Sequence, residues 1–175
     1  MRPTRRQILG TGGGVAAALI LPRSLAFAAQ TVDIVMTGGK MGTHVWFEPT
    51  GIRIAPGQTV RWINRDKANA HTATAYHPKI FDRSRRIPAR AKPWDSDYLL
   101  PDETFSTMLT VPGVYDYYCV PHEQAGMVGR IIVGEPDRNN IEATDADLPQ
   151  AALQALPPIA DIMATGRVSR TSDGG

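Results

Sequence analysis

Cysteine is almost absent from this sequence of 175 residues, which contains Cys119 alone together with four histidines. A single cysteine cannot form a disulfide within the chain, so a disulfide framework is excluded. In an exported protein, a leftover cysteine is expected to be reactive, to pair with another molecule or to bind a metal. The residues around Cys119 therefore decide its role.

A strong net charge is also lacking. Residues 1–28 hold four of the 19 basic residues and none of the 17 acidic ones, so 15 basic and 17 acidic side chains remain beyond them, a net charge of −2. Charge this close to balance gives no reason to expect binding to nucleic acid or to an anionic membrane. The sequence also lacks a motif that pairs a nucleophile with a base, so we do not expect an enzyme.

Residues 1–28 have the order of an export signal: basic residues, then a mildly apolar run rich in glycine and alanine, then small residues before a cleavage site. The paired arginines and the glycine-rich run resemble a twin-arginine (Tat) signal, which is an address read by a receptor. We expect cleavage after Ala28, a periplasmic or otherwise exported protein, and no stable membrane span after cleavage. An uncleaved anchor is the alternative, but Pro22 and Arg23 make the apolar run too short to span a bilayer comfortably.

Residues 29–135 read as one domain of short strands separated by glycine and proline turns. Thr59–Asn64 shows the pattern, because Val60 and Trp62 share one face while Arg61 takes the other. About eight such segments with almost no helical periodicity predict an all-β fold, an antiparallel sandwich or barrel. The expected strands are Thr31–Met36, Val45–Phe47, Ile52–Ile54, Thr59–Asn64, His71–Ala75, Phe105–Thr110, Val114–Cys119 and Met127–Val133.

Two segments depart from this pattern. Tyr76–Thr104 contains four prolines and no clear period, so we expect an excursion from the sheet. Residues 136–175 form a C-terminal extension that begins acidic and becomes apolar and alanine-rich from Leu148 to Leu156, where we expect a short helix that covers part of the sandwich. Ile159–Ala164 can add a second turn or two, and we expect disorder from Arg167 onward.

The stretch Tyr117–Met127 carries the chemistry. His122 follows Cys119 by three positions, and Met127 follows His122 by five. Thiolate, imidazole and thioether are soft or borderline ligands, and two histidines with one cysteine and a weak axial methionine form a blue-copper electron-transfer site. The second histidine must come from another part of the chain. His71 lies 48 positions before Cys119, on a different expected strand, as a site built between strand ends requires.

Several motifs in this chain resemble the cupredoxins. They are Phe47-x-Pro49, Gly57-x-x-Val60-x-Trp62-x-Asn64, His71-Thr72 and Gly113-x-Tyr115-x-Tyr117-Tyr118-Cys119-x-Pro121-His122-x-x-x-Gly126-Met127. The spacing Cys-x₂-His-x₄-Met is similar to that of plastocyanin and pseudoazurin, and differs from that of azurin and amicyanin. The resemblance covers residues 32–133. It implies a Greek-key β-sandwich and one copper ion that cycles between Cu(I) and Cu(II), with His71, Cys119, His122 and Met127 as ligands.

Other copper and metal sites fit less well. A multicopper oxidase usually has histidines beside its cysteine, whereas Tyr118 and Val120 flank this one, and a binuclear copper centre needs a second cysteine. Zinc prefers four strong ligands, and a thioether is a poor one. The ordinary alternative for Cys119 is a buried free thiol.

The remaining histidines have weaker functional readings. We interpret His77 as a loop or surface histidine next to Pro78. His44, Met36 and Met41 could form a second copper site, but core methionines and a surface histidine are the simpler interpretation.

These observations predict an exported one-electron carrier, most simply a monomer, which exchanges electrons with a donor and an acceptor redox protein. A copper-binding or copper-delivery protein, or an accessory cupredoxin of a larger redox complex, is the alternative. The exposed edge of His122 and the basic loop Lys79–Lys92 are candidate docking surfaces, although a basic loop can also be merely solvated. By resemblance, Tyr118, on the outward face of its strand, could offer a second electron route. Thr72, next to His71, could form a hydrogen bond to the Cys119 loop.

Overall fold

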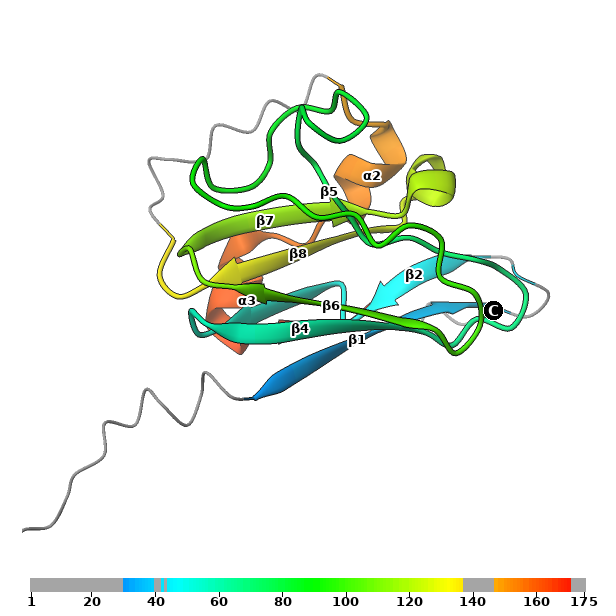
Figure 1. Ribbon diagram of the computed structural model, residues 1–175, viewed down its shortest axis with the longest axis horizontal. Coiled ribbons are helices and arrows are strands. Elements are labelled where there is room, and N and C mark those ends of the chain that lie inside the picture. The colour runs from blue at the N-terminus through cyan, green and yellow to red at the C-terminus, as the bar shows by residue number, and fades with distance from the viewer. Residues whose placement is uncertain (1–29, 40–41, 43, 137–146, 171–175) are drawn as a thin grey trace, which may run out of the picture.

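The structure, a computed structural model, describes residues 30–39, 42, 44–136 and 147–170. The described strands form two sheets that face each other (Figure 1). One sheet has the order β2-β1-β4-β6 and the other the order β5-β7-β8-β3-β9. The strands are β1 (Thr31–Gly38), β2 (Val45–Glu48), β3 (Gly51–Ile54), β4 (Gln58–Asn64), β5 (Thr74–Ala75), β6 (Thr104–Leu109), β7 (Gly113–Tyr118), β8 (Val128–Val133) and β9 (Arg167–Val168). The predicted all-β sandwich is confirmed, and the described strands do not close into a barrel.

The strands follow the predicted segments closely, because alternation of apolar and polar residues marks them. In β4, Val60 and Trp62 are fully buried, while Arg61 between them is exposed. Two pairings depart from the expected antiparallel arrangement, since β1 runs parallel to β4 and β3 runs parallel to β8. Parallel neighbours are joined by crossover connections, which turn residues alone do not reveal.

The core between the sheets is centred on Trp62. Its ring centroid lies 5.3 Å from that of Tyr117 in the opposite sheet and 5.6 Å from that of Trp94. Phe47 meets Tyr117 edge-on, with centroids 4.7 Å apart. Aromatic contacts of this kind add to the stabilisation from buried area alone. The cluster therefore joins both sheets to the excursion, which supplies Trp94.

The excursion Tyr76–Thr104 packs back onto the sandwich. Ile87, Trp94 and Leu99 from this segment are buried in the main core. Leu99 also forms a β-bridge with His71. The excursion therefore forms one wall of the domain and holds the segment that carries His71.

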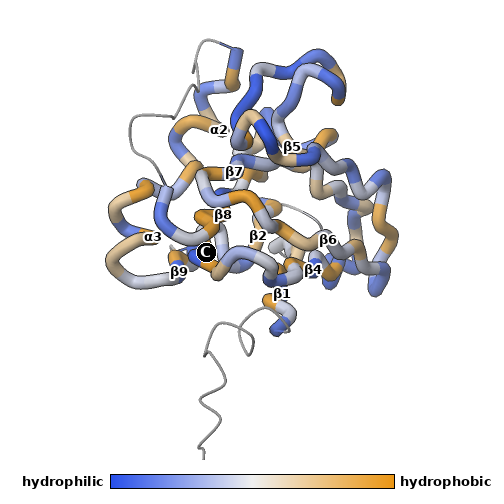
Figure 2. The backbone as a smooth tube through the Cα atoms, turned by 60° about the vertical axis from the view of Figure 1, so that its left-hand side comes forward, coloured by the Kyte–Doolittle hydropathy of each residue, from blue (hydrophilic) through white to orange (hydrophobic). Residues whose placement is uncertain are grey.

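The C-terminal extension covers the outer face of the five-stranded sheet. Its helices α2 (Gln150–Ala155) and α3 (Ile159–Thr165) agree with the predicted helix and second turn. Figure 2 shows hydrophobic residues on α2, and Leu148 and Ala152 are buried in one cluster with Tyr118. None of the helices among the described residues has the length and apolar character of a membrane span.

The expectation of disorder from Arg167 was wrong for the residues that follow directly. Arg167 and Val168 form β9, which pairs with β3 in antiparallel register. A strand of two residues has no periodicity of its own and is recognisable only through its partner. The proposed signal at residues 1–28, with its cleavage point, lies outside the described residues.

Candidate metal centre

Three of the four predicted ligand residues come together at one end of the sandwich. The Nδ1 atoms of His71 and His122 lie 3.2 Å apart. The Sγ atom of Cys119 lies 3.6 Å from Nδ1 of His71 and 3.3 Å from Nδ1 of His122. His71 and Cys119 are fully buried, and His122 is partly exposed. Two imidazoles and one thiol thus lie around a common centre, and of these three side chains only that of His122 is partly exposed.

The dimensions of this triangle suit a metal ion. A point equidistant from the three donor atoms lies about 2.0 Å from each, within the roughly 2.0–2.3 Å range of metal bonds to imidazole nitrogen and thiolate sulfur. Two imidazoles and a thiolate in a trigonal arrangement form the equatorial ligand set of a blue-copper site. The residues present therefore fit a copper ion of this type.

Backbone structure fixes the position of each donor. His71 is held to Leu99 by two hydrogen bonds, with N···O distances of 3.1 and 2.8 Å. Cys119 follows the last residue of β7, and its backbone N–H donates to the carbonyl of Met127 at 3.0 Å. His122 lies in the short 3-10 helix η2 (Val120–Ala125), which begins directly after Cys119. The cysteine is therefore positioned by the sheet, and His122 by a helical turn that starts from it.

Met127, the fourth predicted ligand, closes this loop. It is fully buried and belongs to the same core cluster as Cys119. Its backbone N–H donates to the carbonyl of His122 at 3.1 Å. Gly126 before it has a φ of 80°, a left-handed conformation that glycine adopts without strain, and it lets the chain turn into β8. The geometry anchors Met127 beside the triangle, while its role as the axial ligand stays a prediction.

Burial favours the neutral forms of the three donor side chains. It raises the pKa of the Cys119 thiol to about 11, against the opposing effect of hydrogen bonds from Thr72 and His122. Burial also lowers the pKa values of both His71 and His122. The two histidines are thus in the neutral form that binds metals. The thiol gives up its proton when a metal binds.

The predicted contact of Thr72 with the Cys119 loop is confirmed. The backbone N–H of Thr72 donates to Sγ of Cys119 at 3.3 Å. Its hydroxyl accepts a hydrogen bond from the N–H of Val120 at 2.9 Å. Thr72 therefore connects the two chain segments that supply the donor atoms.

Sequence reasoning missed Asp66. Its Oδ2 atom lies 3.0 Å from Nε2 of His71, on the side of the ring opposite the triangle. Burial alone would raise the pKa of this carboxyl, but hydrogen bonds from Asn69, Ala68 and His71 together lower it. The only signal in the sequence is the cluster of polar residues between Asn64 and His71, which is also typical of an ordinary turn.

Tyr118 lies on the outward face of β7, as predicted, but it is not exposed at the surface. Only 3% of its surface is accessible. Its ring stacks on Tyr76 at a centroid distance of 4.3 Å, and Leu148 and Ala152 of the C-terminal extension pack in the same cluster. Tyr118 is therefore covered by the excursion and the extension, and its use as an electron route stays a prediction.

The other histidines stay apart from the triangle. His77 is buried, contrary to a surface position, and its Nδ1 accepts a hydrogen bond from the N–H of Lys79 at 3.1 Å. His44 is exposed and Met36 is fully buried in the core, which agrees with the simpler interpretation of both. Met41 lies outside the described residues.

Two of the six basic residues in the excursion are used inside the fold. Arg86 is buried and forms an ion pair with Asp116. Arg83 forms an ion pair with Glu123, next to His122. The exposed basic side chains of this loop are Lys79, Arg85, Arg90 and Lys92.

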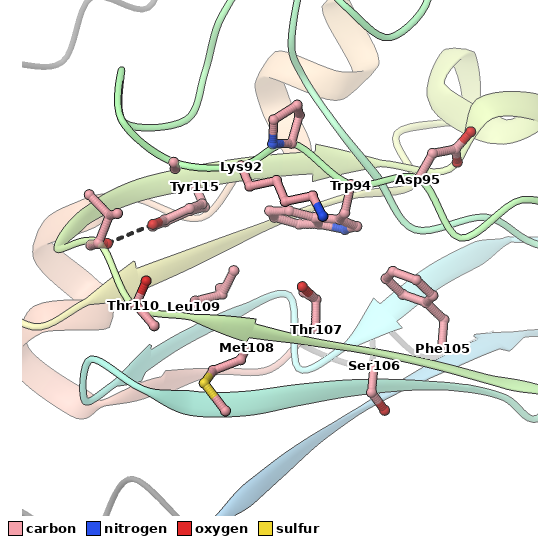
Figure 3. A pocket seen from close by; sticks show the side chains of 13 residues that line it. Lys92, Trp94, Asp95, Phe105, Ser106, Thr107, Met108, Leu109, Thr110 and Tyr115 are labelled. Atoms are coloured by element: carbon pink, nitrogen blue, oxygen red, sulfur yellow. Dashed lines mark hydrogen bonds between the residues drawn. The ribbon is translucent and has the colours of Figure 1, made fainter.

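A separate cavity of about 450 Å³ lies between residues 91–95 and β6 (Figure 3). Its titratable lining residues are Lys92, Asp95 and Tyr115. The hydroxyl of Tyr115 donates to the carbonyl of Val111 at 2.6 Å, and Asp95 accepts a hydrogen bond from Thr74. No histidine or cysteine is among the residues that line this cavity.

Comparison with known proteins places these observations in a family. Residues 32–134 match the family model described as copper binding proteins, plastocyanin/azurin family. The chain is 34% identical to chloroplastic plastocyanin of Oryza sativa subsp. indica over 132 residues, which cover 73% of this chain and 80% of the relative. It is 29% identical to pseudoazurin of Paracoccus pantotrophus over 141 residues, covering 81% and 88% of the two chains. Its fold is similar to the solved pseudoazurin of Sinorhizobium meliloti, with a TM-score of 0.57, 27% identity and coverage of 78% and 98%.

Proposed function

This chain belongs to the plastocyanin/azurin family of copper-binding proteins, and on that premise we propose that it is an exported carrier of single electrons, with one copper ion bound by His71, Cys119, His122 and Met127. The observation that carries this proposal is the triangle of two imidazole nitrogens and one sulfur, with edges of 3.2, 3.3 and 3.6 Å. When bound, copper alternates between Cu(I) and Cu(II) and so takes up or releases one electron.

The protein keeps the ligand geometry fixed while the charge changes. Thr72 braces the Cys119 loop, and paired hydrogen bonds hold His71 against Leu99. Pro121 further stiffens the loop, because its ring fixes its own φ. Donor atoms set in place by a sheet and a short helix need little rearrangement between oxidation states.

Burial of the donors favours a carrier over a copper-delivery protein. A delivery protein needs ligands that exchange easily, whereas His71 and Cys119 are fully buried. Voltammetry of the copper-loaded protein, followed by incubation with a Cu(I) chelator, separates the two functions. We expect a reversible one-electron wave and slow loss of copper. Rapid transfer of the copper to the chelator, without a reversible wave, would support delivery instead.

Two surfaces are proposed for docking of redox partners. His122 is partly exposed and offers a path between solvent and the metal centre, and Pro121, Gln124 and Ala125 near it in the chain are exposed. Of the basic residues in the excursion, Arg83 reaches this area directly, through its ion pair with Glu123. An acidic partner would meet this loop faster than a neutral one, because charge complementarity mainly raises the association rate.

Charge-reversal variants test the loop. With a small acidic cytochrome as the probe, Lys79→Glu and Arg85→Glu together should lower the bimolecular rate of electron transfer several-fold at low salt, and the difference should vanish at high salt. Arg53→Glu and Arg61→Glu together, on β3 and β4, form the control with the same change in net charge, since both arginines are exposed, and they should change the rate little. Equal effects of the loop and control variants would reject the loop as a docking surface.

We further propose that residues 1–28 direct export through the twin-arginine route and are removed after Ala28. Mass spectrometry of the protein from the exported fraction should give an N-terminus at Ala29. Replacement of Arg5 and Arg6 by lysine should retain the precursor inside the cell. An intact N-terminus on exported, membrane-bound protein would instead support an uncleaved anchor.

A further inference from the structure

We infer that Asp66 is a positioning residue for the metal ligand His71, and that its buried carboxylate lowers the reduction potential of the copper centre. This inference rests on the proposed electron-carrier function and deepens it, since the potential decides which redox partners can give or accept electrons.

The first observation is the orientation of the His71 ring. Nε2 lies 3.0 Å from Oδ2 of Asp66, whereas Nδ1 faces Cys119 and His122. A carboxylate accepts hydrogen bonds, so the ring carries its proton on Nε2 and leaves the lone pair of Nδ1 free for the metal. Asp66 therefore selects both the tautomer and the rotation of the ligand.

The second observation is that Asp66 is itself held rigidly. It is 6% exposed, and its N–H donates to Oδ1 of Asn64 at 2.9 Å. Its Oδ1 accepts from the N–H of Ala68 at 2.9 Å, and its Oδ2 accepts from Nδ2 of Asn69 at 2.8 Å. Asn64 is in turn fixed to the carbonyls of Asn69 and Leu99. The carboxylate thus has no freedom to turn away from His71.

The third observation concerns charge. Within the described part of the chain, Asp66 forms no ion pair with a lysine or arginine. Its ionisable partner there is His71. Asp116 and Glu123, the other buried carboxylates, each pair with arginine. Asp66 therefore places a negative charge one imidazole ring away from the metal, while its chain neighbours Arg65 and Lys67 pair with Asp102 at the surface.

A negative charge at this position stabilises Cu(II) more than Cu(I), because attraction grows with the charge of the ion. A carboxylate bonded to a ligand histidine also makes that ligand more basic, and loss of such a partner typically costs 10–100-fold in metal affinity. If Asp66→Asn weakens Cu(II) binding about tenfold more than Cu(I) binding, the potential rises by about 59 mV, the value of a tenfold change for a one-electron couple.

The test compares Asp66→Asn with Asp33→Asn. The first variant removes the charge and leaves an amide that accepts at one of the two oxygen positions. The second removes a carboxylate charge of the same kind, which pairs with Arg61 at the surface. We expect Asp66→Asn to raise the reduction potential, whereas Asp33→Asn should leave the potential essentially unchanged. An unchanged potential in copper-loaded Asp66→Asn, or equal shifts in both variants, would overturn the inference.

A second measurement needs neither a variant nor copper. ¹⁵N NMR of the copper-free protein, which has four histidines to assign, should show the His71 proton on Nε2. A proton on Nδ1 would contradict the inference even if Asp66→Asn fails to fold. The proposed function fails separately, if the wild-type protein does not form a copper–thiolate complex.

Discussion

Replacement of Asp116 should destabilise this domain, because its side chain connects three parts of the chain. It lies on β7 with 1% of its surface exposed. Its carboxylate accepts from Nε of Arg86 in the excursion at 2.9 Å, and from Nε and Nη2 of Arg130 on β8 at 2.6 and 2.9 Å. Arg130 also donates to the carbonyl of Pro157 in the C-terminal extension at 2.8 Å. One carboxylate therefore links the sheet, the excursion and the extension.

The expected cost of Asp116→Ala follows from this burial. Removing one partner of a buried, hydrogen-bonded ion pair costs about 3–5 kcal/mol, because the remaining charge stays in a poorly solvated place. At roughly 2–4 °C per kcal/mol for a domain of this size, the melting temperature should fall by about 6–20 °C. Asp33→Ala is the matched control, since Asp33 pairs with Arg61 at the surface and exposed pairs contribute about 0–1 kcal/mol.

Urea unfolding of the copper-free protein, followed by tryptophan fluorescence, measures the loss of unfolding free energy in Asp116→Ala and in Asp33→Ala. A cost for Asp116→Ala that equals the cost of the Asp33 control would refute the argument. A further variant, with Asp116 replaced by leucine and both arginines by methionine, tests the cause. Because it removes the charges of all three side chains together, it should recover much of the lost stability.

Three further results are expected from the packing around the site. A Cβ atom on Gly129 would lie 2.3 Å from Oη of Tyr117, so Gly129→Ala should cost at least about 1–3 kcal/mol in urea unfolding; a neutral effect would contradict the close packing. Thr72→Val removes the acceptor of the Val120 N–H, so amide exchange at Val120 should accelerate, and unchanged exchange would show that this hydrogen bond is dispensable. Burial raises the pKa values of Tyr115 and Tyr118 to about 12. The free energy of unfolding should therefore keep its full value below pH 10, where tyrosines of the unfolded chain begin to ionise. Between pH 10 and pH 12 it should fall by up to about 1.4 kcal/mol per tyrosine and pH unit. An alkaline titration followed by tyrosinate absorbance measures this, and ionisation of all tyrosines near pH 10 in the folded protein would disprove it.

The β-sandwich could be predicted from the sequence because its signals are local. Alternation in β4 and the turns at glycine and proline mark the strands within one or two residues. The His71–Ala75 segment was the least accurate, since only Thr74–Ala75 form a strand and His71 contributes a single bridge. Its weaker alternation gave less information.

The proximity of Cys119 and His122 could also be predicted, because the two residues are three positions apart. That His71 lies beside them could be predicted only from the strand order that the family resemblance implies. Asp66 could not be predicted, because a polar residue in a turn has the same appearance whether or not it faces a ligand. The burial of Tyr118 was missed for a different reason. Alternation tells which face of β7 it occupies, but the cover over that face comes from α2 and the excursion, which are distant in sequence.

The proposed copper site binds one ion through His71, His122 and the thiolate of Cys119. Titration of the copper-free protein with Cu(II), monitored by visible absorption, tests this binding in wild type, Cys119→Ser and His77→Ala. We predict an intense blue or green colour at one equivalent of copper, bleached by a mild reductant, absent in Cys119→Ser and intact in His77→Ala. A colourless copper complex of the wild type, or loss of colour in His77→Ala, would contradict the account.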